Sequence, residues 1–186
     1  MSLPGPEWNP VAFKEWSLVC DAIAEGQQSI ILRKGGIAEG RSGFQWDHRR
    51  FFLFPTHFHE QEDKIRVHPE KPVAAKDGTI ELELYVETLQ TGRLTDWNEI
   101  RRLESFHIWS EETIRERFEW GDEPGISYAM IQAKRLIEPI VLKDGPEFGG
   151  CRSWVDLPAG KTEQALSLID SAAEVQIFCG SPNWLE

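Results

Sequence analysis

The residues best suited to chemistry lie close together, between positions 26 and 61. A short apolar run there ends in Arg33 and Lys34, followed directly by Gly35 and Gly36. Consecutive backbone N–H groups in a glycine turn can point at one oxyanion, and neighbouring cations add favourable charge. The pattern predicts an anion-binding turn. The alternative is a tight turn whose two basic side chains are solvated.

A pair of histidines, His57 and His59, follows the aromatic run at residues 51–54 and precedes Glu60. In an extended segment both imidazoles face the same way, which suits metal ligation as well as acid–base chemistry near neutral pH. Spacing fixes no third ligand, so the sequence predicts no metal site and no cofactor. His57, His59 and Glu60 are therefore the catalytic candidates of the chain.

We expect the strand at 51–54 to deliver Phe54, Thr56 and His57 beside the turn at Arg33. A nucleotide, a modified base or a short single strand of nucleic acid would then pair its phosphate with the two cations and stack its base on the aromatic wall. The predicted function is a binding module of this kind. The competing hypothesis is a small hydrolase or nuclease-associated enzyme that uses the two histidines and the following glutamate, with or without a metal ion.

Several signatures of common enzymes are absent from the chain. It contains no G-x-x-x-x-G-K-[ST] phosphate loop, no G-x-G-x-x-G, no G-x-S-x-G and no H-E-x-x-H. These absences disfavour Walker-type nucleotidases, common dehydrogenases, serine hydrolases and zinc proteases.

The charge balance limits the possible partners. The chain of 186 residues has a formal net charge of −11, and an acidic surface opposes the phosphate contacts that long duplex DNA requires. The cations gather between residues 33 and 50, whereas acidic residues gather at 81–87 and 111–123. A small anionic ligand or a short RNA or DNA segment is compatible with this distribution.

The composition, with 40% hydrophobic and 27% charged residues, is that of a soluble globular protein. There is no apolar run of about 18 residues, and no basic stretch precedes an apolar one at the N-terminus. Neither membrane insertion nor secretion is predicted. The three cysteines, Cys20, Cys151 and Cys179, form no C-x-x-C pair and indicate a reducing cytoplasm. Oligomeric state leaves no mark in the sequence.

The elements that must position the candidate residues begin with a predicted helix over about residues 10–25. Asn9 and Pro10 suit its first positions, and Gly26 suits its end. Its apolar stripe consists of Ala12, Trp16, Val19, Cys20 and Ile23.

The clearest strand is predicted at residues 79–87, where apolar and polar residues alternate. Successive side chains of a strand point to opposite faces, so the alternation predicts one buried face and one wet face. The buried set is Ile80, Leu82, Leu84 and Val86, and the wet set is Glu81, Glu83 and Glu87.

The remaining elements follow from apolar runs and turn residues. Strands are expected at 29–32, at 51–54 with Pro55 as its end, at 126–136 with a continuation at 140–142, and at 175–179. Helices are expected at 96–103, 111–120 and 162–173, and residues 61–77 are the expected mobile excursion.

Strands and helices are interspersed without regular β-α-β spacing. This arrangement favours an α+β fold, in which a mixed, largely antiparallel curved sheet or small barrel has helices packed around it. The chain reads as a single domain over residues 1–186, with the helix at about 10–25 and a sheet core at about 28–180.

Several segments resemble an uncharacterised bacterial family known as domain of unknown function 1802. They run from Phe13 to Trp154 and read F-K-E-W-S-L-V-C-D-A-I-A-E-G, I-L-R-K-G-G-I-A-E, F-L-F-P-T, F-H-I-W-S-E-E-T-I-R-E-R-F-E-W and G-G-C-R-S-W. The resemblance implies no established activity.

A weaker resemblance is to RNA-associated domains of the ASCH type, which belong to the PUA-like barrel group. In these domains an N-terminal helix is followed by G-x-K-x-x-E-x-R, and Gly26 and Arg33 keep its first and last positions. Gln28 stands where the lysine would be, and Ile31 stands where the glutamate would be. The resemblance therefore implies a PUA-like barrel that recognises a nucleotide or nucleic-acid feature more readily than one with a shared catalytic activity.

Overall fold

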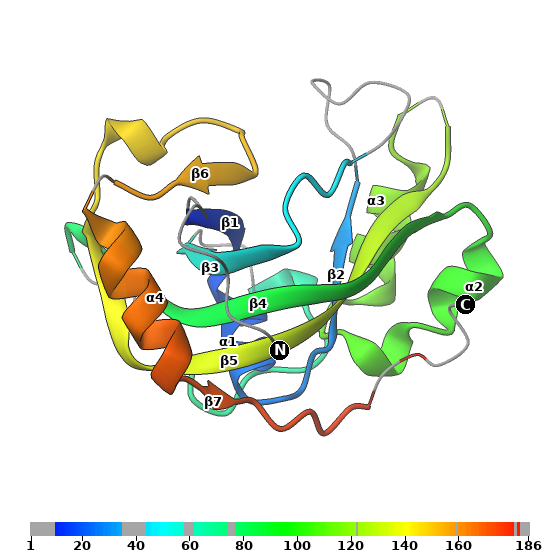
Figure 1. Cartoon of the computed structure of the whole chain (residues 1–186). Helices are drawn as coiled ribbons and strands as arrows, with labels where there is room; N and C mark the ends of the chain where they lie inside the picture. Colours follow the sequence, from blue (N-terminus) through cyan, green and yellow to red (C-terminus); the bar gives the residue numbers. More distant parts are fainter. Residues whose placement is uncertain are drawn as a thin grey trace.

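A curved, mixed sheet of seven strands forms the centre of the molecule (Figure 1). The computed structural model describes residues 10–34, 44–57, 62–73, 77–121, 123–158, 160–180 and 182. The strands are β1 (Val11–Trp16), β2 (Ile30–Arg33), β3 (Arg50–Thr56), β4 (Thr79–Leu94), β5 (Ile126–Lys143), β6 (Trp154–Asp156) and β7 (Ala173–Glu174).

The strand order is β2-β5-β4-β3-β1-β6, and β7 pairs with β5. Among the described strands, β1 and β3 run parallel, and every other pairing is antiparallel. The sheet does not close, because no ladder joins β2 to β1 or β6 in the part of the chain described. The predicted α+β class with a mixed, largely antiparallel curved sheet is confirmed.

The helices are α1 (Ser17–Ala24), α2 (Trp97–Arg101), α3 (Glu111–Glu119) and α4 (Lys161–Ser171). Side-chain caps begin two of them: Asp96 accepts from the Asn98 N–H, and Ser110 accepts from the Thr113 N–H. The predicted helices at 96–103 and 111–120 are confirmed. No helix of the described residues is long and apolar enough to cross a membrane.

The predicted helix over residues 10–25 is wrong in its first half. Residues 11–16 form β1, which lies between β3 and β6 in the sheet, and the helix begins only at Ser17. Both faces of β1 are covered, since Ala12 and Phe13 are fully buried in two different core clusters. A strand buried on both faces carries no clean alternation, so its apolar residues also fitted a helical stripe.

The predicted end of α1 is confirmed at Gly26, which has φ +72° and donates its N–H to the carbonyl of Ile23. A Cβ at this position would clash with the carbonyl oxygen of Gln176. Phe178 in turn donates its N–H to the carbonyl of Gly26. The segment 175–179 therefore packs along the end of α1 as an irregular chain, and the strand predicted there is wrong.

Pro55 does not end its strand. It pairs with Glu15 in the β1–β3 ladder, whereas the β3–β4 ladder runs only from Arg50 to Phe52. Beyond Phe52, one edge of β3 has no strand beside it among the described residues, and such an edge tolerates a residue without an N–H. The strand β6 is short and was not predicted at all.

The long strands β4 and β5 pair along their whole length and span the molecule. A register shift between Leu82 and Leu84 places Leu82 in the cluster beneath α4 and Leu84 in the larger cluster inside the curved sheet. The predicted single buried face of β4 is therefore wrong: Leu82 and Leu84 face opposite sides of the sheet. Pro139 does not interrupt β5, so the predicted continuation at 140–142 is confirmed within a single strand.

The predicted wet face of β4 is wrong at Glu87, which is only 5% exposed. Its carboxylate lies 3.2 Å from Arg49 Nε and 3.3 Å from Arg50 Nη2. Arg50 is its partner across the β3–β4 ladder, so cross-strand pairing brings in the counter-charge that makes burial tolerable. Glu81 and Glu83 are partly exposed, as predicted.

Residues 62–73, within the expected excursion, are fastened to the rest of the protein. Ile65 forms a bridge with Trp109, and the carboxylate of Glu25 accepts from the N–H groups of Glu70 and Lys71 at 2.7 Å. These contacts hold the segment against α1. Residues 61 and 74–76 lie outside the described part of the chain.

Leu82→Ala and Leu84→Ala should each lower the free energy of unfolding by about 2–5 kcal/mol, because each change empties space in a buried cluster. Glu83→Gln should cost less than about 1 kcal/mol, since its ion pair with Arg135 is partly exposed. Urea denaturation measures all three. Equal, small effects would contradict the described packing of β4.

Candidate functional site

Arg33, the last residue of β2, reaches β1, although no ladder pairs these two strands. Its Nη2 atom is 3.4 Å from the carboxylate of Glu15 and donates to the carbonyl of Lys14, both on β1. Its guanidinium carbon is 4.7 Å from the centre of the Phe13 ring. Arg33 thus joins two strands that no ladder connects, through a buried ion pair and a cation–π contact.

Arg117 of α3 lies beside this pair, between two tryptophans. Its guanidinium carbon is 3.7 Å from the Trp109 ring centre and 5.0 Å from that of Trp16. Burial, and secondarily nearby Arg33, lowers the pKa of Arg117 to about 10, while Glu15 and Glu116 act in the opposite direction. The side chain still carries its charge at neutral pH, so two arginines share the single carboxylate of Glu15.

Several N–H donors in this region are buried and have no hydrogen-bond partner among the described residues. They are Arg33 Nε, Arg117 Nη1, Trp46 Nε1 and Trp154 Nε1. Trp46 and Trp154 contact the Phe13 ring at centroid distances of 5.4 and 4.8 Å. We call this group the arginine–tryptophan cluster: Phe13, Glu15, Trp16, Arg33, Trp46, Trp109, Arg117 and Trp154.

The cluster is rich in donors and poor in acceptors. Its one carboxylate, Glu15, is 1% exposed and already accepts from the Trp16 N–H at 2.8 Å besides pairing with Arg33. A buried donor without an acceptor costs about 1–3 kcal/mol. The arrangement is therefore suited to a ligand that brings acceptor oxygens and negative charge.

Lys34 has a different role from the one predicted. Its ammonium group donates to the carbonyls of Phe118, Glu123 and Gly125 at 3.0–3.1 Å, which uses all three of its hydrogens. Burial, and secondarily Arg93, lowers the pKa of Lys34. The side chain fastens the end of α3 to the chain that follows. Gly35 and Gly36 lie outside the described residues.

The predicted wall beside Arg33 is divided between two sides of the sheet. Phe54 points into the cluster beneath α4, where its ring centre is 5.4 Å from that of Phe148. Thr56 donates its hydroxyl to the Glu15 carbonyl at 3.0 Å. Thr56 is thus close to the arginine–tryptophan cluster, whereas Phe54 faces away from it.

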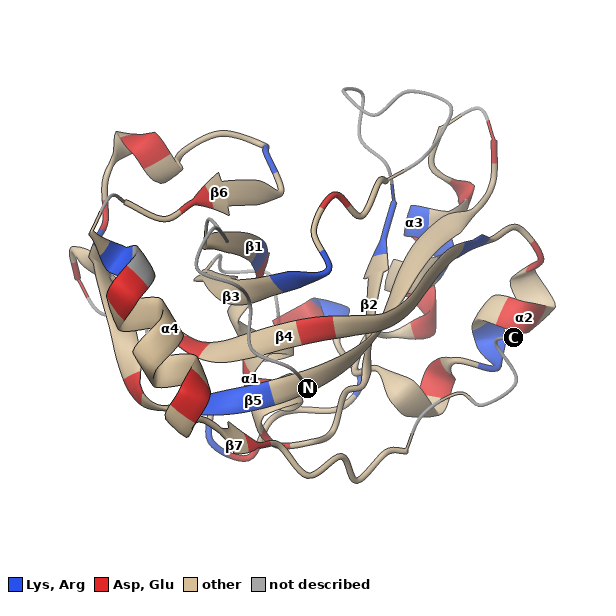
Figure 2. Cartoon of the chain, in the orientation of Figure 1, with Lys and Arg blue, Asp and Glu red and all other residues tan. Residues whose placement is uncertain are grey.

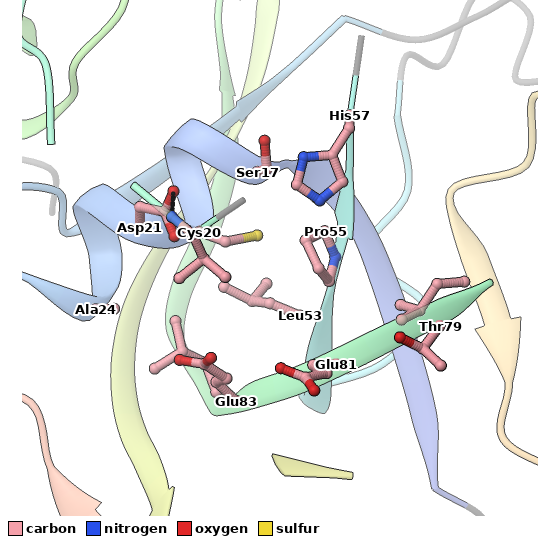
Figure 3. A pocket seen from close by; sticks show the side chains of 13 residues that line it. Ser17, Cys20, Asp21, Ala24, Leu53, Pro55, His57, Thr79, Glu81 and Glu83 are labelled. Atoms are coloured by element: carbon pink, nitrogen blue, oxygen red, sulfur yellow. Dashed lines mark hydrogen bonds between the residues drawn. The ribbon is translucent and has the colours of Figure 1, made fainter. Parts of the chain in front are cut away.

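His57 lies in a separate hollow, which does not include Arg33 (Figure 3). The hollow has a volume of about 610 Å³, open to solvent, between α1, β3 and the first part of β4. We call it the acidic hollow. Its lining residues are Ser17, Cys20, Asp21, Ala24, Leu53, Pro55, His57, Val73, Thr79, Ile80, Glu81, Glu83 and Leu84. His59 and Glu60 lie outside the described residues.

Burial governs the titration of several groups in the acidic hollow. It raises the pKa of Asp21 to about 6, with smaller upward contributions from Glu83 and Glu25, while the Val73 N–H and Arg135 lower it. Burial also lowers the pKa of His57 and raises that of the Cys20 thiol well above its usual range. At neutral pH the imidazole and the thiol are therefore both uncharged.

Side chains that could ligate a metal are not gathered at either place in the described part of the chain. No group of three histidine, cysteine, aspartate or glutamate side chains among the described residues is arranged to hold a metal ion. The carboxylates of the acidic hollow are spread around its wall, as the labelled side chains in Figure 3 show.

The sequence singled out Arg33 as a candidate, but not Arg117 or the tryptophans around it. Arg117 sits in the acidic stretch 111–120, where it reads as a solvated helix residue. The signal that could have found it is its place one residue before Phe118, on a helix whose buried residues include Thr113, Ile114 and Phe118. The eight tryptophans were noticeable, but their spacing does not reveal which of them meet.

A family model described as domain of unknown function (DUF1802) matches residues 12–175. The chain belongs to this family. The fold of this DUF1802 protein is similar to crystal structures of two single-substitution variants of ZmASCH from Zymomonas mobilis, with TM-scores of 0.53 and 0.52. Each is 14% identical, and the similarity covers 88% or 87% of this chain and 99% of ZmASCH. No curated protein matches the chain in sequence.

The likeness to ZmASCH supports the ASCH-like fold that the motif at residues 26–33 indicated. The two residues that depart from this motif are core residues of the DUF1802 protein. Gln28 donates to the Ile30 carbonyl at 2.9 Å and accepts from the Ile108 N–H at 3.1 Å, and Ile31 is fully buried. Of the four motif positions, Arg33 is the one that reaches the arginine–tryptophan cluster.

Asp21→Asn should change stability in a pH-dependent way. The pKa of Asp21 is raised on folding, so the folded state binds more protons between about pH 4 and pH 6 and loses stability as pH rises through that window. Relative to the variant, wild type should lose up to about 3 kcal/mol of unfolding free energy between pH 3 and pH 7.5. Urea denaturation at several pH values measures this, with Asp170→Asn on α4 as the control. A pH-independent difference would contradict the burial argument.

Proposed function

We propose that the DUF1802 protein is a binding module for a nucleotide or a short single strand of nucleic acid, and that the arginine–tryptophan cluster holds this ligand. The observation that carries the proposal is the set of four buried N–H donors without partners in the described part of the chain, on two arginines and two tryptophans. Phosphate and base carbonyl oxygens are the acceptors that such a set lacks. Arginine forks and indole rings are also the groups on which nucleic acids commonly pair and stack.

The distribution of charge supports an anionic ligand at this place. Although the chain is acidic overall, basic residues occur at the end of β2, on α3 and at the start of β3 (Figure 2). Phe13 links two of these positions, since it contacts Arg33 of β2 and also Phe51, the neighbour of Arg50 in β3. Arg49, whose side chain is 71% exposed, adds a cation that a phosphate can reach from solvent.

The fold supports binding more than catalysis. ASCH-type domains belong to a group associated with RNA, and this chain shares their architecture with ZmASCH. The lysine and glutamate positions of the ASCH motif are occupied by Gln28 and Ile31, which are buried in structural roles. A ligand at the cluster therefore meets cations and aromatic rings, and Glu15, the one carboxylate among the cluster's described residues, is already paired.

The test is binding of fluorescently labelled hexanucleotides of RNA and DNA, and of mononucleotides in competition with them. Arg33→Lys and Arg117→Lys keep a charge beside Glu15 but remove the planar fork. Each variant should weaken binding by about 1.5–3 kcal/mol through loss of a charge-assisted hydrogen bond. Wild-type affinity should also fall as salt rises.

The matched control is Arg101→Lys on α2, where the exposed side chain pairs with Glu111 at 3.8 Å. It should bind as wild type does, and circular dichroism should show the same fold for all three variants. The proposal is wrong if wild type binds none of the probes. It is also wrong if the two cluster variants, while folded, bind as tightly as the control.

A further inference from the structure

We propose that the acidic hollow is a second binding site, which takes a small organic cation: an ammonium group carried on a short apolar body. The hollow lies apart from the arginine–tryptophan cluster and differs from it in charge. It is an open hollow whose lining combines apolar side chains with carboxylates, the combination that a ligand with an apolar body and a charged end requires. The inference does not depend on what the cluster binds.

The walls of the hollow are suited to the apolar body of such a ligand. Its apolar lining consists of Leu53 and Pro55 of β3, Ile80 and Leu84 of β4, and Val73. Leu53 and Leu84 are almost fully buried. An aliphatic chain or small ring placed between them would leave water without breaking a hydrogen bond, which is favourable.

The charges around the hollow are suited to the ammonium group. Asp21 on α1 and Glu81 and Glu83 on β4 bring carboxylates to it from two sides (Figure 3). Asp21 is 8% exposed, and its carboxylate accepts a hydrogen bond from a neutral donor, the Val73 N–H, at 3.1 Å. None of the described lysines or arginines forms an ion pair with Asp21, so a buried negative charge there lacks a counter-charge.

The other groups in the hollow do not supply that counter-charge. Burial keeps the imidazole of His57 neutral at pH 7. Arg135 lowers the pKa of Asp21, but its ion pair, at 3.6 Å, is with Glu83. The carboxylates are not arranged in a group that could hold a metal ion, on the residues described. Carboxylates spread over an apolar wall favour an organic ammonium ion, because its three N–H donors can point to separate acceptors while its carbon chain lies on the wall.

Isothermal titration calorimetry tests this with n-pentylamine and 1,4-diaminobutane as probes, and with 1-pentanol and pentanoate as uncharged and anionic analogues. The amines should bind at least about tenfold more tightly than 1-pentanol, because only they gain charge-assisted hydrogen bonds, and pentanoate should not bind. Asp21→Asn keeps an oxygen for the Val73 N–H but loses the charge, and should weaken amine binding by about tenfold. Glu81→Gln should weaken it by a smaller factor.

Glu163→Gln, which removes an exposed carboxylate on α4, is the matched control and should bind amines as wild type does. Equal binding of amine and alcohol would overturn the proposal, since the hollow would then be an apolar pocket without charge selectivity. An equal loss in Glu163→Gln would also overturn it, because the attraction would come from net charge alone. If Asp21→Asn does not fold, unchanged amine binding by Glu81→Gln overturns the proposal and weakened binding supports it.

Discussion

The ion pair between Glu15 and Arg33 is the contact on which the rest of this structure depends. It joins β1 to β2 where the sheet has no ladder, and it does so with a carboxylate that is almost completely buried. Burying a charge in this way is tolerable only while the pair and its hydrogen bonds remain intact. The carboxylate of Glu15 accepts from the backbone N–H of Trp16 and pairs with the guanidinium of Arg33. A network of contacts, more than a single bond, therefore holds β1 and β2 together where no ladder joins them.

This network also determines the character of both candidate sites. Because Arg33 occupies Glu15, Arg117 has no carboxylate of its own beside the two tryptophans and remains a buried positive charge. On the α1 side, the same strand end leads into the helix that carries Asp21, a buried negative charge without a cation. Among the described residues, Arg117 and Asp21 are thus largely buried charges of opposite sign, each influenced by nearby charged groups but without an ion pair of its own.

The sequence predicted correctly those helix starts and ends that depend on residues close together in the chain. Ser110 and Asp96 cap their helices with their own neighbours, and Gly26 ends α1 through a positive φ. Residues 11–16 were misassigned because their strand is decided by partners far away in sequence, β3 and β6. Glu87 and Arg117 were misjudged for the same reason: cross-strand arginines bury the first, and Trp16 and Trp109 enclose the second. Arg33 was singled out as a candidate because its neighbours in sequence, Lys34, Gly35 and Gly36, indicated a turn; its role in binding stays a prediction.

The position of β1 has a consequence for how the protein forms during synthesis. This strand is made early, yet one of its two neighbours, β6 (Trp154–Asp156), emerges only after β5 is complete. Until then the edge of β1 that will receive β6 stays open, including the Lys14 N–H that later donates to the Ser153 carbonyl. Pairings between segments so distant in sequence are slow to form and leave unpaired strand edges exposed meanwhile. A nascent chain that stops before residue 154 therefore exposes an unpaired edge of β1, which can pair with another chain and which β6 covers in the complete fold.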